Sequence, residues 1–177
     1  YAPGDTDIAW TRITRWRALL AAALDEPPFE QVTSVTVTGG SDSPRVDLLG
    51  LWLGMSLDCP VTRARSRPGE GVMSVRLQRE SGPIDLVRVD GDTAVLLAPG
   101  KLPRRVTLPH STMAQSLAAE LHRLDVDSVY ERVLRAVGRV HVDSTTASEA
   151  YRARKALDTA SALAAEAAAL APQKEDA

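Results

Sequence analysis

Cysteine, asparagine and aromatic residues are scarce or missing in this 177-residue sequence. Cys59 stands alone, so the chain can form no internal disulfide and a reducing compartment is expected. The lack of asparagine removes every N-glycosylation sequon. Aromatic residues make up only 4%, too few to form a stacking platform for single-stranded nucleic acid. No stretch approaches the roughly 20 apolar residues of a membrane span, and no signal peptide is visible.

A marked excess of one charge is also absent. The chain carries 21 basic and 23 acidic residues, a net charge of -2, whereas a nucleic-acid-binding domain is usually clearly basic. We therefore expect a protein that binds neither nucleic acid nor membrane. The hydrophobic fraction of 44% is enough for a core, and the length suits one domain, with or without an appendage. Because the first residue is Tyr1, we expect a processed chain or a fragment of a longer one.

Apolar residues at helical spacing predict four helices and a further alanine-rich one. The first, over residues 5–24, carries Trp16 and Leu20 on its apolar face and stops before Pro27. The second is apolar over most of its circumference and should be deeply buried. The third follows a cap near residue 112, and the fourth starts at residue 125 or 127 and ends near 138. The second predicted helix spans residues 43–57, the third spans residues 113–124, and the alanine-rich helix spans residues 147–170.

Between residues 58 and 110 the apolar period changes from 3.6 to 2, which predicts short strands. Glycine-rich breaks of a few residues join them, so we expect an antiparallel meander. The sequence thus predicts an α+β domain, with an antiparallel sheet of about five or six strands and helices packed on one face. Leu53, Leu117 and Leu121 should face the sheet together with Trp16 and Leu20. The predicted strands are 32–38, 61–65, 72–79, 84–89, 94–98 and 106–108.

No pattern in the sequence indicates an enzyme. His110, His122 and His141 are far from one another in the chain and lack the spacing of metal ligands. There is no glycine-rich phosphate loop followed by a helix. Cys59 fits a buried, inert thiol better than a reactive one. We therefore expect no catalytic residue, no metal and no cofactor.

Arginine accounts for 18 of the 21 basic residues, and several arginines fall in patterns. Two explanations stay open: a composition bias of the source genome, or a protein built for two-point polar contacts. Arginines that alternate on a strand project from one face, which suits solvent or a docking surface for an acidic patch or a phosphorylated ligand. The candidate partner-binding residues are Arg12, Arg15, Arg63, Arg65, Arg104 and Arg105.

Four segments resemble the glucose-6-phosphate dehydrogenase assembly protein family, OpcA. Residues 4–20 contain Trp10 and Trp16 in a long matching run, and residues 47–53 are similar to the family's second helix. Residues 117–125 and 127–130 are similar to its late helical pair. The order and spacing match over about residues 1–137. The resemblance is to the C-terminal half of the family, so its N-terminal half is expected to precede Tyr1.

The resemblance implies a non-catalytic, cytoplasmic partner of glucose-6-phosphate dehydrogenase that helps the enzyme assemble or become active, in the oxidative pentose phosphate pathway. NADP and the sugar phosphate would belong to the enzyme. Residues 1–140 would form the family's domain and residues 141–177 a helical extension, with self-association possible. The alternative is a module that senses a phosphorylated sugar or nucleotide through the strand face that carries Arg63 and Arg65.

Overall fold

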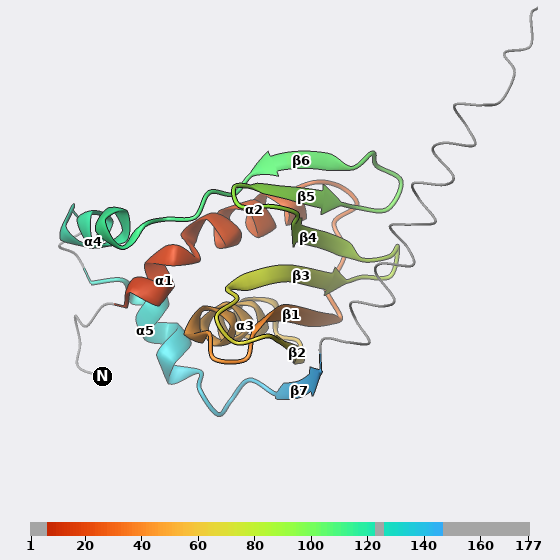
Figure 1. Ribbon diagram of the computed structural model, residues 1–177. Coiled ribbons are helices and arrows are strands. Elements are labelled where there is room, and N and C mark those ends of the chain that lie inside the picture. Colours follow the sequence, from red (N-terminus) through yellow and green to blue (C-terminus); the bar gives the residue numbers. More distant parts are fainter. Residues whose placement is uncertain (1–6, 123–125, 147–177) are drawn as a thin grey trace, which may run out of the picture.

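The computed structural model describes residues 7–122 and 126–146. These residues form a seven-stranded sheet and five helices (Figure 1). The predicted alanine-rich helix over residues 147–170 lies outside the described residues. The helices are α1 (Ile8–Arg12), α2 (Thr14–Leu24), α3 (Pro44–Leu57), α4 (Met113–His122) and α5 (Ser128–Arg135). The strands are β1 (Ser34–Gly40), β2 (Val61–Ser66), β3 (Val72–Gln78), β4 (Ile84–Arg88), β5 (Thr93–Leu97), β6 (Arg104–Thr107) and β7 (Val142–Thr146).

The sheet is mixed, with the strand order β6-β5-β4-β3-β1-β2-β7. Strands β3 to β6 form an antiparallel meander, but the predicted meander also included residues 61–65, and these form β2, which pairs in parallel with β1 and β7. The α+β class is confirmed, but a wholly antiparallel sheet of five or six strands is wrong. Helix α3 returns the chain to the starting end of β1, so β2 runs in the same direction as β1. Strand β7 was not predicted because its sequence, VDSTT, contains one apolar residue.

Two glycines at the end of β1 allow the chain to cross over this strand. Strands β2 and β3 flank β1 on opposite sides, so the segment that joins them, residues 67–71, passes over the C-terminal end of β1. The Gly40 amide donates hydrogen bonds to the carbonyls of Glu70 and Gly71 at 3.1 and 3.2 Å. A Cβ atom on Gly40 would overlap the Glu70 carbonyl, and one on Gly39 would overlap that of Gly71. The glycine pair therefore permits a close crossing of two backbones.

The core lies between the sheet and the helices α2 and α3, which lie behind the sheet in Figure 1. Val37 on β1 and Leu53 on α3 are almost completely buried. Trp16 and Leu20 on α2 belong to the same core, as predicted. Burying a leucine or valine side chain contributes about 1.5–3 kcal/mol, so this layer holds the fold together. No helix among residues 7–122 and 126–146 is long and apolar enough to cross a membrane.

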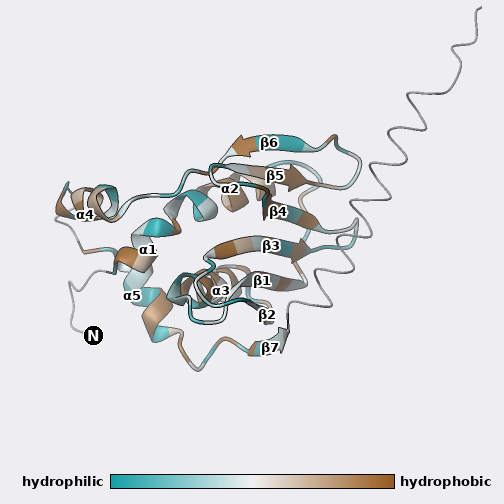
Figure 2. Ribbon diagram, viewed as in Figure 1, coloured by the Kyte–Doolittle hydropathy of each residue, from teal (hydrophilic) through white to brown (hydrophobic). Residues whose placement is uncertain are grey.

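Helix α4 does not pack as predicted. Leu117 and Leu121 should face the sheet, but their side chains are 48% and 67% exposed. The inner face of the sheet is already covered by α2 and α3, and α4 packs instead against α1. Its one buried residue is the small Ser116. Figure 2 shows that α4 carries hydrophobic residues at the edge of the molecule, away from the core.

Candidate functional site

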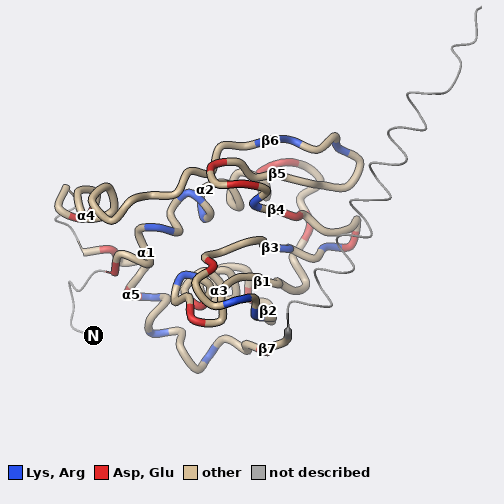
Figure 3. The backbone as a smooth tube through the Cα atoms, viewed as in Figure 1, with Lys and Arg blue, Asp and Glu red and all other residues tan. Residues whose placement is uncertain are grey.

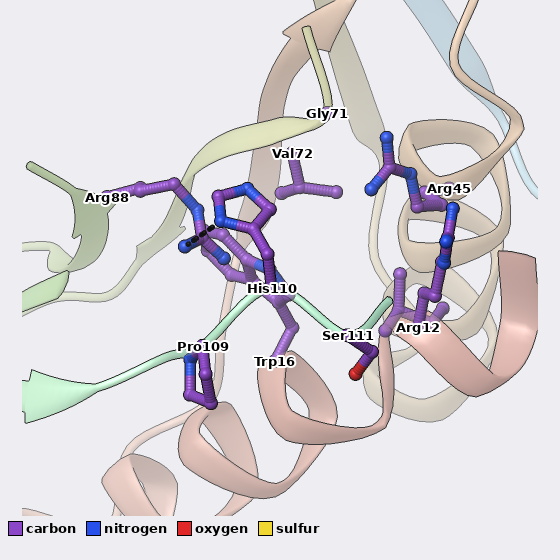
Figure 4. Close-up of a pocket in the computed structure, with 10 residues that line it drawn as sticks. Arg12, Trp16, Arg45, Gly71, Val72, Arg88, Pro109, His110 and Ser111 are labelled. Atoms are coloured by element: carbon purple, nitrogen blue, oxygen red, sulfur yellow. Dashed lines mark hydrogen bonds between the residues drawn. The ribbon is translucent and has the colours of Figure 1, made fainter. Parts of the chain in front are cut away.

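Three arginine side chains and a histidine converge on a small pocket at one end of the core (Figure 4). Arg12 comes from the last turn of α1, Arg45 from the first turn of α3 and Arg88 from the end of β4. His110 comes from the segment between β6 and α4. Trp16 forms part of the wall of this pocket. Residues distant in the sequence thus meet at one point, and three of the four carry a permanent positive charge.

Local sequence explains how each arginine reaches the pocket. Arg88 follows the buried Leu86 by two positions on β4, so both project from the helix-covered face of the sheet. Arg45 follows Pro44, which occupies the first position of α3, where a missing amide proton costs nothing. The Arg45 guanidinium lies against Gly71, where a Cβ atom would come within 3.0 Å of its nitrogen. Gly71 therefore leaves the space that this guanidinium occupies.

The hydrogen bonds of the three arginines are incomplete. Arg88 donates through Nη1 to the Leu108 carbonyl at 2.7 Å and to the Gly91 carbonyl, and its Nε is buried without a partner. Arg12 Nε donates to Ser116 Oγ at 3.3 Å. Within the described part of the chain, the Arg45 guanidinium has neither a hydrogen bond nor an ion pair. Donor capacity is therefore left over on all three sides of the pocket.

Positive charge in the pocket is poorly neutralised. Burial lowers the pKa of Arg45, and the nearby charge of Arg12 lowers it further. Burial also lowers the pKa of Arg88, where Arg45 acts in the same direction and Asp92 and Asp90 act against it. No carboxylate among residues 7–122 and 126–146 forms an ion pair with any of the three arginines. An arrangement of this kind is suited to hold an anion.

A comparison with known protein families covers the residues that form this pocket. Residues 3–134 match a family model described as the C-terminal domain of a glucose-6-phosphate dehydrogenase subunit. The chain belongs to this family. The resemblance found in the sequence is thereby confirmed. Every residue that lines the pocket lies inside the matched range, whereas β7 lies beyond it. No curated protein matches the chain.

The arginines predicted as partner contacts lie on α1, α2, β2 and β6, and β2 and β6 stand near opposite ends of the strand order. Figure 3 shows basic residues spread over many elements of the fold. Of the predicted arginines, only Arg12 lies in the pocket. Arg63 forms an ion pair with Asp47 on α3 at 3.0 Å, and burial keeps the pKa of that carboxyl above its usual value. Arg65 donates to Ser144 Oγ on β7 at 3.3 Å. Arg104 pairs with Glu26 at 2.6 Å. Arg15 and Arg105 are exposed.

Sequence reasoning missed Arg45, Arg88 and His110 as site residues. A usable signal exists for Arg88, because the alternation of β4 places this charged residue on the same face as the apolar Leu86. A charge at an inward position requires a partner or a function. No comparable signal marks Arg45 or His110, since only the folded chain brings α3 beside the segment after β6.

Cys59 and possible metal-binding groups are the other candidates for chemistry in the part of the chain that the structure describes. Cys59 is partly buried, and burial together with the charge of Asp58 raises the pKa of its thiol. A thiol with a raised pKa is a poor nucleophile at neutral pH. Across residues 7–122 and 126–146, no group of three or more histidine, cysteine or acidic side chains could hold a metal ion.

Proposed function

We propose that this domain is a non-catalytic partner of glucose-6-phosphate dehydrogenase that acts in the cytoplasm and helps the enzyme assemble or shifts it towards an active form. The observation that carries the proposal is the family match over residues 3–134. The role as an assembly factor or activator goes beyond membership of the family and is the part to be tested. In this proposal NADP and the sugar phosphate of the reaction are bound by the enzyme.

The energetic demand of such a role is modest. A partner shifts an equilibrium only by binding one form better than the other. A tenfold shift towards the active form requires about 1.4 kcal/mol of differential binding free energy. A few well-packed side chains at a protein interface supply this amount.

An exposed apolar face on α4 is the surface that we place in this interface. Met113, Leu117 and Leu121 recur on one side of the helix and are 57%, 48% and 67% exposed. Contiguous exposed apolar residues on a folded domain mark interaction sites. We retain the predicted arginines in the proposal. Arg15, Arg65, Arg104 and Arg105 are exposed, and because Arg65 and Arg104 already contact Ser144 and Glu26, Arg15 and Arg105 are the two most accessible to a partner.

The test is to titrate the chain into purified glucose-6-phosphate dehydrogenase while following enzyme activity and, by light scattering after gel filtration, the mass of the complex. We expect the two proteins to migrate together and the activity to rise. A Leu117→Ser/Leu121→Ser double variant should weaken the complex. The matched control is Leu102→Ser, since Leu102 is 86% exposed and lies outside α4.

The proposal fails if the proteins migrate separately and the kinetics stay unchanged, including when the N-terminal half of a family member is supplied. If the complex forms but the double variant binds as well as the wild type, the α4 face is excluded and the partnership stands. An Arg15→Ala/Arg105→Ala variant then tests whether charge carries the contact instead.

The alternative ligand-sensing function through Arg63 and Arg65 has a separate test. Calorimetry with glucose 6-phosphate, 6-phosphogluconate and NADP(H) on the wild type and on Arg63→Ala/Arg65→Ala would reveal it. The internal contacts of both arginines, with Asp47 and Ser144, reduce what that face can offer to a ligand.

A further inference from the structure

We propose that the pocket formed by Arg12, Arg45, Arg88 and His110 binds the phosphoryl group of a small phosphate monoester. The inference goes beyond the partnership with the dehydrogenase and does not depend on it. It starts from the convergence of three guanidinium groups with an imidazole at one cavity (Figure 4). Like charges repel, so bringing three of them together in one fold has an energetic cost that a bound anion would offset.

The unmet hydrogen-bonding capacity points to a ligand. Within the described chain, the Arg45 guanidinium has no hydrogen bond and no ion pair, although the residue is partly buried. Most buried polar groups in folded proteins have partners, so an unpaired and partly buried guanidinium is a departure that an anion explains.

An imidazole also lines the pocket beside the arginines. Ser111 follows His110 and lines the same pocket, but its hydroxyl points away from the guanidinium groups in Figure 4. His110 is held in place because its amide donates to Asp92 Oδ1 at 3.1 Å. Its Nδ1 lies 3.4 Å from Arg88 Nη1, so the imidazole stands directly beside this guanidinium. Guanidinium and imidazole groups are both typical phosphate ligands.

Charge favours a phosphoryl group over a carboxylate. The cavity volume is about 20 Å³, so the pocket admits only the end of a ligand and not a whole nucleotide or sugar. The remainder of a monoester would therefore lie outside the cavity. A phosphoryl group carries about -1.5 to -2 charges at neutral pH and three acceptor oxygens, whereas a carboxylate carries one charge and two oxygens. The positive charge of three guanidinium groups around a small volume is therefore matched better by a phosphoryl group than by a carboxylate.

The test is calorimetry on the full chain with four probes at equal ionic strength. We expect inorganic phosphate and glucose 6-phosphate to bind, and glucose not to bind. Succinate, a dianion made of two carboxylates, should bind at least tenfold more weakly than glucose 6-phosphate. The Arg45→Met variant should weaken phosphate binding at least tenfold, because it removes the unpartnered guanidinium. The matched control, Arg105→Met, removes an exposed arginine elsewhere and should bind like the wild type.

Folding of the variants is checked by thermal denaturation. Without anion, Arg45→Met should melt at or above the wild-type temperature, since an unpaired charge has been removed. Added phosphate should raise the melting temperature of the wild type and leave that of Arg45→Met unchanged. A second variant, Gly71→Ala, keeps all charges but displaces the Arg45 guanidinium, so it should weaken binding as well.

Several results would overturn the proposal. The proposal fails if the wild type does not bind phosphate, or if Arg45→Met binds phosphate as tightly as the wild type does. It also fails if Arg105→Met loses as much phosphate affinity as Arg45→Met, which would mean unspecific charge attraction. Binding of inorganic phosphate with exclusion of glucose 6-phosphate contradicts the assignment to a monoester. Succinate that binds as tightly as glucose 6-phosphate would assign the pocket to a carboxylate, such as an acidic side chain of a protein partner. Because all probes act on the isolated chain, these results are independent of the dehydrogenase titration.

Discussion

Asp127 joins two parts of the molecule that are far apart in the sequence. Its Oδ1 accepts hydrogen bonds from the amides of Val129 and Tyr130 and so caps α5. Its Oδ2 accepts from the indole nitrogen of Trp10 on α1 at 2.8 Å. The Trp10 ring lies 5.4 Å from that of Tyr130, and the Arg17 guanidinium lies 3.7 Å above it. One carboxylate therefore fixes α5 against the first helix.

Replacing Asp127 should alter stability in a way that depends on pH. Partial burial acts to raise the pKa of Asp127, but the hydrogen bonds from Trp10 and the two amides outweigh it and the pKa lies below its usual value. The folded chain thus favours the carboxylate, and the stabilisation is present above about pH 4 and lost as the pH falls further. Asp127→Ala should lower the free energy of unfolding by about 1–2 kcal/mol at pH 7.

Urea denaturation at a series of pH values checks this expectation. Asp127→Asn retains an oxygen that can cap α5 but does not titrate, so its deficit relative to the wild type should shrink between about pH 5 and about pH 3. A deficit that stays constant over this range would show that the charge of Asp127 contributes nothing.

The crossing of β1 gives a prediction at Gly40. The Gly40→Ala variant places a methyl group against the Glu70 carbonyl, so the backbone of residues 67–71 must move. We expect a loss of about 2 kcal/mol or more in the free energy of unfolding. Gly91→Ala is the matched control, since a Cβ atom there meets nothing within 4 Å, and its effect should stay within about 0.5 kcal/mol. Equal effects in the two variants would refute the tight crossing.

At the scale of elements, an apolar stripe on a helix does not by itself identify what covers it. The spacing of Leu53 on α3 and of Leu117 on α4 predicts burial equally, yet only Leu53 is buried. Helix α3 lies between β1 and β2 in the chain and must pack on them, whereas α4 follows the last strand of the meander and lies against α1. The order of elements along the chain decides which stripe reaches the core.

This difference predicts unequal costs for one type of substitution. Leu53→Ala should lower the free energy of unfolding by about 2–5 kcal/mol, because it leaves a cavity in the core. Leu117→Ala should change it by less than about 0.5 kcal/mol, since the side chain is 48% exposed and alanine favours a helix. Chemical denaturation of the isolated chain measures both. A large loss in Leu117→Ala would mean that α4 is covered by something in the isolated chain.

The sequence identifies elements better than it places them. Local periodicity predicts the helical segment of α1 and α2 and the meander from β3 to β6, because these depend on neighbours in the chain. The parallel pairing of β2 with β1 and the polar strand β7 depend on contacts between residues far apart in the chain, so local periodicity does not predict them. The site follows the same rule: the alternation of β4 marks Arg88, whereas Arg45 and His110 acquire meaning only where α3 meets the segment after β6.

For the molecule as a whole, β7 completes one edge of the sheet. It pairs in parallel with β2 over residues 142–146, beyond the matched family range. The predicted domain boundary at residue 140 stays a prediction, and β7 lies on the far side of it. A strand edge without a partner exposes amides and carbonyls that can pair with other molecules. The edge of β2 is therefore shielded by residues that the family match does not include.

Two shortened chains test the importance of this strand. A chain that ends at Thr146 keeps β7, and one that ends at Val140 lacks it. We expect the shorter chain to melt at a lower temperature and to form larger species as its concentration rises, because the edge of β2 becomes available. Thermal denaturation and gel filtration at several concentrations measure both effects. Identical behaviour of the two chains would show that β7 adds nothing to the sheet.

The place of Trp16 has a practical consequence for spectroscopy. Its indole forms part of the pocket wall, with the Arg88 guanidinium 5.6 Å from the ring. Indole emission is sensitive to charges in its surroundings, and an anion that enters beside Arg88 changes the field at the ring. The molecule thus contains a built-in fluorophore at the point where occupancy has to be detected, and titrations can be followed by intrinsic emission without attaching a dye.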